Sequence, residues 1–247
     1  MEDNKTLNYI KDVLENMPNG WLNLTTHRLD IYTEKLAKVQ FLEKLEVLFN
    51  TNNSDSSALS ELPTAFDYIR LGHPLSCVLE WAIAKLNNLN SENVISFTSN
   101  TIPVLAILRK NLLDDKNTQI IYTNELPASF DPQILKDVYG YKFELKKVAF
   151  GAAIPAFNGS TIFIEHTNDV CRFDLIPNVD FFVNVHAHLG SVLVVNGKQN
   201  ESYVSEIQHV RRRETISMTP ANSLVALEIL LEKSISANQK SNVAVNK

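Results

Sequence analysis

From Pro63 onward, short β-rich runs alternate with amphipathic helical segments, and this alternation constrains the fold more than any other feature. The predicted strands cover 93–99, 119–124, 141–148, 160–166, 180–185 and 191–197. The predicted helices cover 76–89, 100–113, 131–140, a stretch from about 202, and about 220–235. Strands separated by helices of about 10 to 14 residues predict an α/β fold, with a parallel sheet covered by helices.

The first 60 residues have a different texture. Leu7, Ile10 and Val13 stand at helical spacing, and residues 32–49 repeat that pattern. The polar stretch TNNSDSSALSEL then predicts a flexible loop. We therefore expect three parts, which are a separable helical arm with its loop over 1–60, an α/β domain over 61–236, and a disordered tail over 237–247.

Composition excludes several classes of protein. The chain has 247 residues and a net charge of −5, so nucleic acid is not an expected partner. No apolar run approaches the roughly 18 residues of a membrane span, and the N-terminus has no apolar signal region. Two distant cysteines, Cys77 and Cys171, predict core packing and not a disulfide framework or zinc site. These features predict an intracellular protein, cytoplasmic or nuclear, with no membrane partner.

The segment FDYIRLGHPLSCVLEWAIAKL resembles the entry signature of the Cys/Met-metabolism family of pyridoxal-phosphate enzymes, of the cystathionine γ-synthase and γ-lyase type. Tyr68 and Arg70 match its Tyr-x-Arg, and Glu80 matches its Leu-Glu helix. His73 stands where the family has Asn. The resemblance implies that Tyr68 and Arg70 reach the cofactor phosphate of a neighbouring subunit.

The resemblance continues in order over about residues 63–233. ISFTSNTIPVLAIL resembles the turn and helix that cradle the phosphate, which assigns Ser99 to that turn. TIFIEHTND resembles a strand ending in Glu-Thr-Pro, with Glu165 matching and Asn168 a possible match. The resemblance implies the three-layer α/β/α large domain of a type I enzyme, truncated, with an N-terminal helical arm and a vestigial phosphate site at Tyr68, Arg70 and Ser99.

The residues that the cofactor chemistry needs are missing from this pattern. Pyridoxal phosphate requires a Schiff-base lysine, a carboxylate at the pyridinium nitrogen and phosphate donors. The lysine turn aligns with 186–190, which puts Ala187 at the lysine position. A helix and a strand ending in the carboxylate are deleted before Asp180, and the glycine of the phosphate turn is replaced by Asn100. The chain also ends where the family's C-terminal domain begins.

Three polar patterns have competing interpretations. His186 and His188 could bind a metal with His166 or Asp180, but we favour a pair of turn histidines. The run 211–213 (Arg-Arg-Arg) could be a phosphate patch or a kinase site, and we favour a solvated helix end. Arg70 could bind an anion, or it could pair with Asp67 or Glu80.

Two hypotheses for function follow from these observations. The first is a non-catalytic pseudoenzyme, a structural or regulatory subunit that joins a protein partner or a homo-oligomer and needs no cofactor. The alternative is a divergent lyase or transsulfuration enzyme of sulfur amino acids, which would use pyridoxal phosphate and a lysine placed elsewhere or supplied by a partner. A nucleotide-binding domain is disfavoured because neither G-x-G-x-x-G nor G-x-x-x-x-G-K-[ST] occurs.

Overall fold

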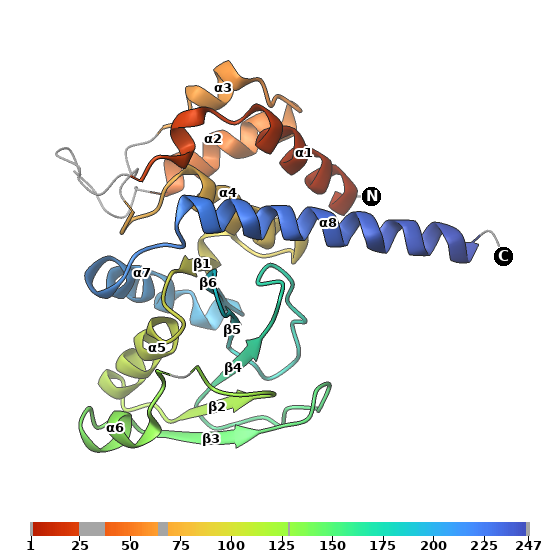
Figure 1. Ribbon diagram of the computed structural model, residues 1–247. Coiled ribbons are helices and arrows are strands. Elements are labelled where there is room, and N and C mark those ends of the chain that lie inside the picture. Colours follow the sequence, from red (N-terminus) through yellow and green to blue (C-terminus); the bar gives the residue numbers. More distant parts are fainter. Residues whose placement is uncertain (1, 25–37, 64–68, 128, 246–247) are drawn as a thin grey trace.

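The computed structural model describes residues 2–24, 38–63, 69–127 and 129–245. Helices and strands alternate over residues 74–147, as the sequence predicts, and three more strands then follow one another over 160–195 before the last two α-helices (Figure 1). The strands are β1 (Val94–Phe97), β2 (Thr118–Tyr122), β3 (Phe143–Lys147), β4 (Ser160–His166), β5 (Phe181–His186) and β6 (Gly190–Val195). The helices are α1 (Glu2–Asn16), α2 (Val39–Asn50), α3 (Ser56–Ser60), α4 (Pro74–Leu86), α5 (Ile102–Leu113), α6 (Pro132–Asp137), α7 (Ser202–Glu214) and α8 (Pro220–Val245), with short 3-10 turns η1 (Asn19–Leu22), η3 (Ser91–Asn93) and η4 (Lys198–Asn200).

The six strands form one mixed sheet in the order β1-β6-β5-β4-β2-β3. The neighbours β3, β2, β4 and β5 run parallel, whereas β6 is antiparallel to both β5 and β1. The prediction of a parallel sheet was therefore wrong for β6. Only residues 187–189 separate β5 from β6, and a link that short can join only antiparallel neighbours.

Helices cover both faces of the sheet. On one face, α4 and α8 pack with α1 and α2 over side chains such as Val192 and Val194. On the other face, residues of α5, α6 and α7 pack over side chains such as Ile95 and Leu193. Successive residues of β6 thus face opposite cores, as the strand geometry requires. These two cores confirm the three-layer α/β/α architecture.

The connection from β4 to β5 is short and irregular. Residues 167–180 contain no helix or strand, and β4 pairs directly with β5 in the register Ile162 with Phe181. That a helix and a strand are deleted here relative to the resembled family stays a prediction. This segment instead lies along α8, where the Cys171 thiol contacts the carbonyl oxygen of Ala226 and Arg172 contacts the Ser234 hydroxyl.

The N-terminal helices share a core with the α/β domain. The rings of Tyr9, Phe49 and Trp81 meet edge to face at centroid distances of 5.1 to 6.0 Å. The predicted flexible loop contains α3, whose Leu59 is buried. Because these apolar side chains need cover from water, the described part of 1–60 packs as a layer on α4 and not as a separate arm. At the other end, α8 continues past residue 236 to Val245.

Candidate functional site

The turn before α4 is closed by His73. Its Nδ1 accepts a hydrogen bond from the Ser76 backbone N–H at 3.2 Å, and its Nε2 lies 2.7 Å from the Met218 carbonyl oxygen. Nε2 therefore carries the proton. Burial lowers the pKa of His73 to about 4, although the Met218 bond and the Glu80 charge oppose the shift. A neutral His73 thus caps α4 and ties it to the segment before α8.

A buried ion network lies behind α4, with Glu80 at its centre. The Glu80 carboxylate contacts Lys38 Nζ at 2.5 Å and Arg211 Nη1 at 3.0 Å, and it accepts hydrogen bonds from the Ser96 N–H and hydroxyl. Burial acts to raise the pKa of Glu80, but Lys38 and Arg211 outweigh it and hold that pKa below its ordinary value. The network contradicts two expectations, because Glu80 pairs with Arg211 and not with Arg70, and because Arg211 is buried and not solvated.

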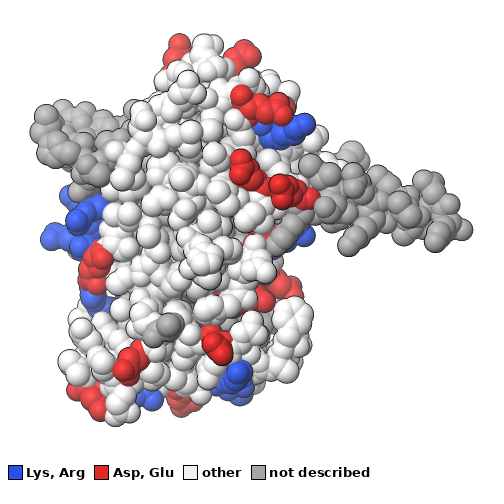
Figure 2. All heavy atoms as spheres, in the orientation of Figure 1, with Lys and Arg blue, Asp and Glu red and all other residues white. Residues whose placement is uncertain are grey.

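Arg70, by contrast, is exposed at the end of α7. Its Nη1 donates to the Arg212 carbonyl oxygen at 3.3 Å, and the neighbouring Arg213 is also exposed. Figure 2 shows basic side chains gathered along this side of the molecule. Tyr68 and Asp67 lie outside the described residues, so the predicted Tyr68–Arg70 pair and the Asp67 alternative stay predictions.

The turn between β1 and α5 holds Ser99, the predicted phosphate residue. The Ser99 hydroxyl accepts hydrogen bonds from the backbone N–H groups of Thr101 (3.3 Å) and Ile102 (3.2 Å). The Ser99 carbonyl accepts a hydrogen bond from Ser191 at 2.6 Å. An anion at a helix N-terminus binds through free backbone N–H groups. Here the protein's own hydroxyl occupies two of them, so Ser99 acts as a cap for α5.

The turn between β5 and β6 carries Ala187 at its exposed tip. His186 Nδ1 accepts hydrogen bonds from the backbone N–H groups of His188 and Leu189, and Asn222 of α8 donates to the carbonyls of both. This tight turn contains no amine. Lys198 follows the far end of β6, about 20 Å away for a strand of this length.

Gly190 allows the β5–β6 turn to lie close to the backbone of β1. Its φ is +112°, and a Cβ there would stand 2.2 Å from the Phe97 carbonyl oxygen. Only glycine fits such a contact. The tips of the β1–α5 and β5–β6 turns are therefore held side by side.

In the described part of the chain, no three potential ligands among His, Cys, Asp and Glu come together, at the histidine pair or elsewhere. Asp180 precedes β5, at the opposite end from His186, and accepts hydrogen bonds from the Thr161 N–H and the Asn200 side chain. His186 is the acceptor that closes its turn. The interpretation as turn histidines is the one that agrees with this geometry.

The residues at this edge do not fit pyridoxal phosphate. Ala187 offers no amine for a Schiff base, and the Ser99 hydroxyl takes the N–H groups that a phosphate would use. Asn100 replaces the glycine of the phosphate turn, and the side-chain oxygen of Asn100 is buried there. We therefore derive no chemical step through this cofactor.

A different site, which sequence reasoning missed, lies toward the carboxyl ends of β4 and β5. It is a cavity of about 40 Å³ lined by aromatic, acidic and amide side chains. Its walls are Ala149, Phe150, Gly151, Ala152, Phe163, Glu165, Phe173, Asp174, Ile176, Phe182 and Asn184. Burial, and then the charge of Asp174, raise the pKa of Glu165. In the sequence Glu165 stands out only as a match to the Glu-Thr-Pro motif, and nothing there places residues 149–152 or 173–176 beside it.

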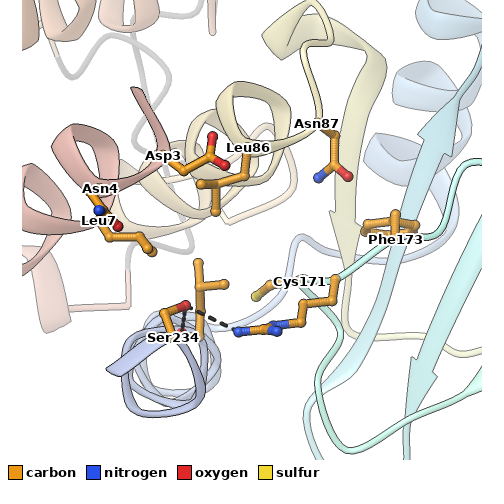
Figure 3. A pocket seen from close by; sticks show the side chains of 10 residues that line it. Asp3, Asn4, Leu7, Leu86, Asn87, Cys171, Phe173 and Ser234 are labelled. Atoms are coloured by element: carbon orange, nitrogen blue, oxygen red, sulfur yellow. Dashed lines mark hydrogen bonds between the residues drawn. The ribbon is translucent and has the colours of Figure 1, made fainter. Parts of the chain in front are cut away.

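A larger and more open groove of about 370 Å³ runs between α1, the end of α4, the 171–173 segment and α8 (Figure 3). Leu7, Leu86 and Leu230 form its apolar floor. The guanidinium of Arg172 lies at its edge, held by Asp169 at 3.2 Å and by the Ser234 hydroxyl at 3.2 Å. The groove marks the seam where the N-terminal layer meets α8.

No helix in the described residues is long and apolar enough to cross a membrane. Both cysteines are buried and neither forms a disulfide, which agrees with the predicted core packing.

No known protein family matches the chain in sequence, and no curated protein is similar to it in sequence. Among solved structures, it is similar to metB from Corynebacterium glutamicum, with a TM-score of 0.45 and 15% identity over 71% of this chain and 55% of that one. It is also similar to cystathionine gamma-lyase from Lactobacillus plantarum complexed with L-serine, with a TM-score of 0.46 and 14% identity over 68% of this chain and 54% of that one. The chain thus spans about half the length of each. Its α/β fold with a mixed six-stranded sheet is similar to part of these structures, and the likeness assigns no residue a role.

Proposed function

We propose that this chain is a non-catalytic subunit of a protein assembly, in which the fold serves as a structural or regulatory part. The observation that carries the proposal is the β5–β6 turn. There Ala187 stands at the position that the sequence resemblance assigns to the reactive lysine, and the turn is closed by backbone and amide hydrogen bonds. Function must be argued from the site, and this site has lost the group that carries the chemistry.

The surface also supports an interacting role. Several large apolar side chains are exposed, among them Val138 at 73% and Tyr139 at 59%, which follow α6, and Phe150 at 83%, which follows β3. Figure 2 shows a face whose central area, over the first part of α8 and below it, carries few charged side chains. Protein interfaces are depleted in charge and enriched in aromatic residues at their centres.

The absence of catalysis is tested with pyridoxal phosphate. The purified protein is incubated with the cofactor, its absorbance in the aldimine region is recorded, and the mixture is reduced with borohydride before peptide mapping. We expect no stoichiometric lysine adduct and no turnover of cystathionine or cysteine. A single reduced lysine together with turnover would replace the proposal with the divergent-enzyme alternative.

The assembly is tested by native mass spectrometry and analytical ultracentrifugation of the full chain, alone and as isolated with its partners. We expect a stoichiometric complex, homomeric or with another protein, that Val138→Asp weakens. Lys136→Glu, in the helix that ends just before Val138, is the matched control. A monomer that co-purifies with no stoichiometric partner would contradict the proposal.

A further inference from the structure

The two edge strands of the sheet, β1 and β3, differ in how their outer backbone groups are satisfied. At β1, the Val94 carbonyl oxygen accepts a hydrogen bond from Lys38 Nζ at 2.8 Å. The Ser96 N–H donates to the Glu80 carboxylate at 2.7 Å, and the Ser96 carbonyl oxygen accepts from Arg211 Nη1 at 3.1 Å. The buried ion network therefore takes the place of a neighbouring strand, and this edge is closed to further pairing.

The outer edge of β3 is open. The N–H of Val148, just after β3, donates to the Tyr122 carbonyl oxygen of β2 at 3.0 Å. Because backbone groups alternate in direction along a strand, the residues whose groups face away from β2 are Phe143, Leu145 and Lys147. No described residue forms a hydrogen bond with these outward groups. Figure 1 shows β3 at the border of the sheet, where such a row of unpaired groups is a template for an added strand.

The charges along β3 match those of a second, antiparallel β3. Glu144 and Lys146 are exposed and lie on the same face of the strand. When two β3 strands run antiparallel with Leu145 opposite Leu145, Glu144 of each copy lies opposite Lys146 of the other. These are non-hydrogen-bonded pairs, in which the Cα atoms are about 4.5 Å apart and the side chains lie closest. Opposite charges in such cross-strand pairs stabilise the pairing.

Other two-fold antiparallel registers fit less well. Centring the axis on residue 144, 146 or 147 places like charges opposite each other, which are Glu144 with Glu144, Lys146 with Lys146, or Lys147 with Lys147. Centring it on Phe143 pairs only residues 143–145 of a strand of five residues. The register centred on Leu145 pairs the whole strand and opposes no like charges.

Apolar side chains at the two ends of β3 fit the same arrangement. Val138 and Tyr139 precede β3 and are exposed, and the Tyr139 ring stacks on Tyr141 at a centroid distance of 5.9 Å. Phe150 follows β3 and is also exposed. In an antiparallel pair, the segment before one β3 lies beside the segment after the other. The exposed apolar groups of the two copies would then cover each other from water.

We propose that a second copy of this chain pairs with β3, antiparallel and about a two-fold axis at Leu145, so that two six-stranded sheets join into one. The inference rests on the proposed function as a subunit of an assembly, and it names the partner and the surface. The pairing uses the open edge of each copy and leaves the two closed β1 edges at the ends. Growth therefore stops at a dimer.

The test is analytical ultracentrifugation of the full chain and of two charge reversals, Glu144→Lys and Lys146→Glu. Each reversal places like charges opposite each other twice in the dimer, by symmetry, and should weaken dimerisation by about tenfold or more. An equimolar mixture of the two variants restores opposite charges at both positions, so it should form a heterodimer with nearly the wild-type affinity. The double variant should also dimerise. Glu43→Lys, which reverses an exposed charge on α2, is the matched control and should leave dimerisation unchanged.

Amide hydrogen exchange of the ¹⁵N-labelled chain at low and high protein concentration locates the contact. Dimerisation should slow exchange at Leu145 and Lys147, whose N–H groups face outward, and leave exchange at Glu144 and Lys146 unchanged. Circular dichroism checks that each variant retains its fold.

The outcomes separate this inference from the proposed function. A dimer that neither reversal weakens, or a variant mixture that does not associate, would overturn the inference and leave the assembly to another surface. So would a chain that is monomeric alone but binds a different protein. A monomer with no stoichiometric partner would overturn the proposed function as well.

Discussion

Lys38 Nζ lies 2.5 Å from the Glu80 carboxylate, with both side chains no more than 5% exposed. Lys38 also donates to the carbonyl oxygens of Ser91 (2.9 Å) and Val94 (2.8 Å), just before and at the start of β1. It precedes α2, so this one contact joins the N-terminal layer, α4 and the sheet. Arg211 holds the other side of the same carboxylate. The three-layer arrangement therefore depends on a charge cluster as well as on apolar packing.

Glu80→Gln is expected to lower the free energy of unfolding by about 3 to 5 kcal/mol, because two buried cations lose their counter-charge. Urea unfolding followed by circular dichroism measures the change. Lys11→Gln, which removes an exposed pair with Glu15, should change stability by less than about 0.5 kcal/mol. The double variant Lys38→Met with Glu80→Gln should be more stable than the sum of the single losses predicts. A small effect of Glu80→Gln would mean that the cluster is hydrated.

His73 predicts a loss of stability in mild acid. Its pKa falls from 6.5 to about 4 on folding, so the unfolded chain binds the proton more tightly. The stabilisation is complete above pH 6.5 and is lost as the pH falls toward 4, by about 3 kcal/mol in all. Stability measured from pH 7.5 to 4 should show this slope, and His73→Asn, which keeps a capping side chain, should flatten it. If the slope of stability against pH is unchanged in His73→Asn, other titratable groups cause it.

Ser99→Ala is expected to lower stability by about 1 kcal/mol, because the N–H groups of Thr101 and Ile102 lose their acceptor. Ser205→Ala, at an exposed position of α7, serves as the control. Thermal unfolding of the two variants gives the comparison. If Ser99→Ala has no effect on stability but abolishes inorganic phosphate binding, the turn is an anion site and not a cap.

We expect Glu165 to change the stability of the protein with pH in the opposite direction from His73. Its pKa is raised on folding by burial and by Asp174, so the folded state binds the proton more tightly. The contribution of Glu165 to stability therefore decreases as the pH rises above its unfolded value of 4.5. Glu165→Gln should gain stability relative to the wild type across that rise. If Glu165→Gln is destabilised by the same amount at every pH, the Glu165 carboxylate of the wild type accepts a stabilising hydrogen bond and the prediction is wrong.

The two thiols should be inert in the native protein. Cys77 and Cys171 are each 1% exposed, and burial raises the pKa of Cys77 to about 12. We expect no reaction with an aromatic disulfide reagent on the minute timescale, and two thiols per chain after denaturation. Ser205→Cys provides an exposed thiol as the positive control. Rapid labelling of the native wild type would indicate local opening around α4 or the 167–180 segment.

All six strands and the main helices could be predicted from periodicity, with shifts of a few residues at most ends, whereas α8 continues to Val245 and was expected to end near 235. The predicted strand 160–166 coincides with β4, and the predicted helix 131–140 contains α6, which Asp131 caps through its carboxylate. The direction of β6 was wrong, although the short link at 187–189 was a signal that could have found it. The composition of 1–60 predicted a separate arm. The sequence pattern shows that these helices have apolar faces, but it does not show that those faces pack against α4.

The sequence by itself determined that this is an α/β chain and that Ala187 stands where the resemblance places a lysine. The fold class follows from periodicity, which depends on local spacing. The absence of a lysine at 187 follows from the identity of a single residue. Only the tertiary structure decided that Arg211 and not Arg70 meets Glu80, and that Ser99 caps its own helix. It alone brought Asn184, Glu165 and Asp174 to one cavity. Such contacts join residues from separate elements, and burial, which sets their charge and hydrogen bonding, exists only once those elements have packed.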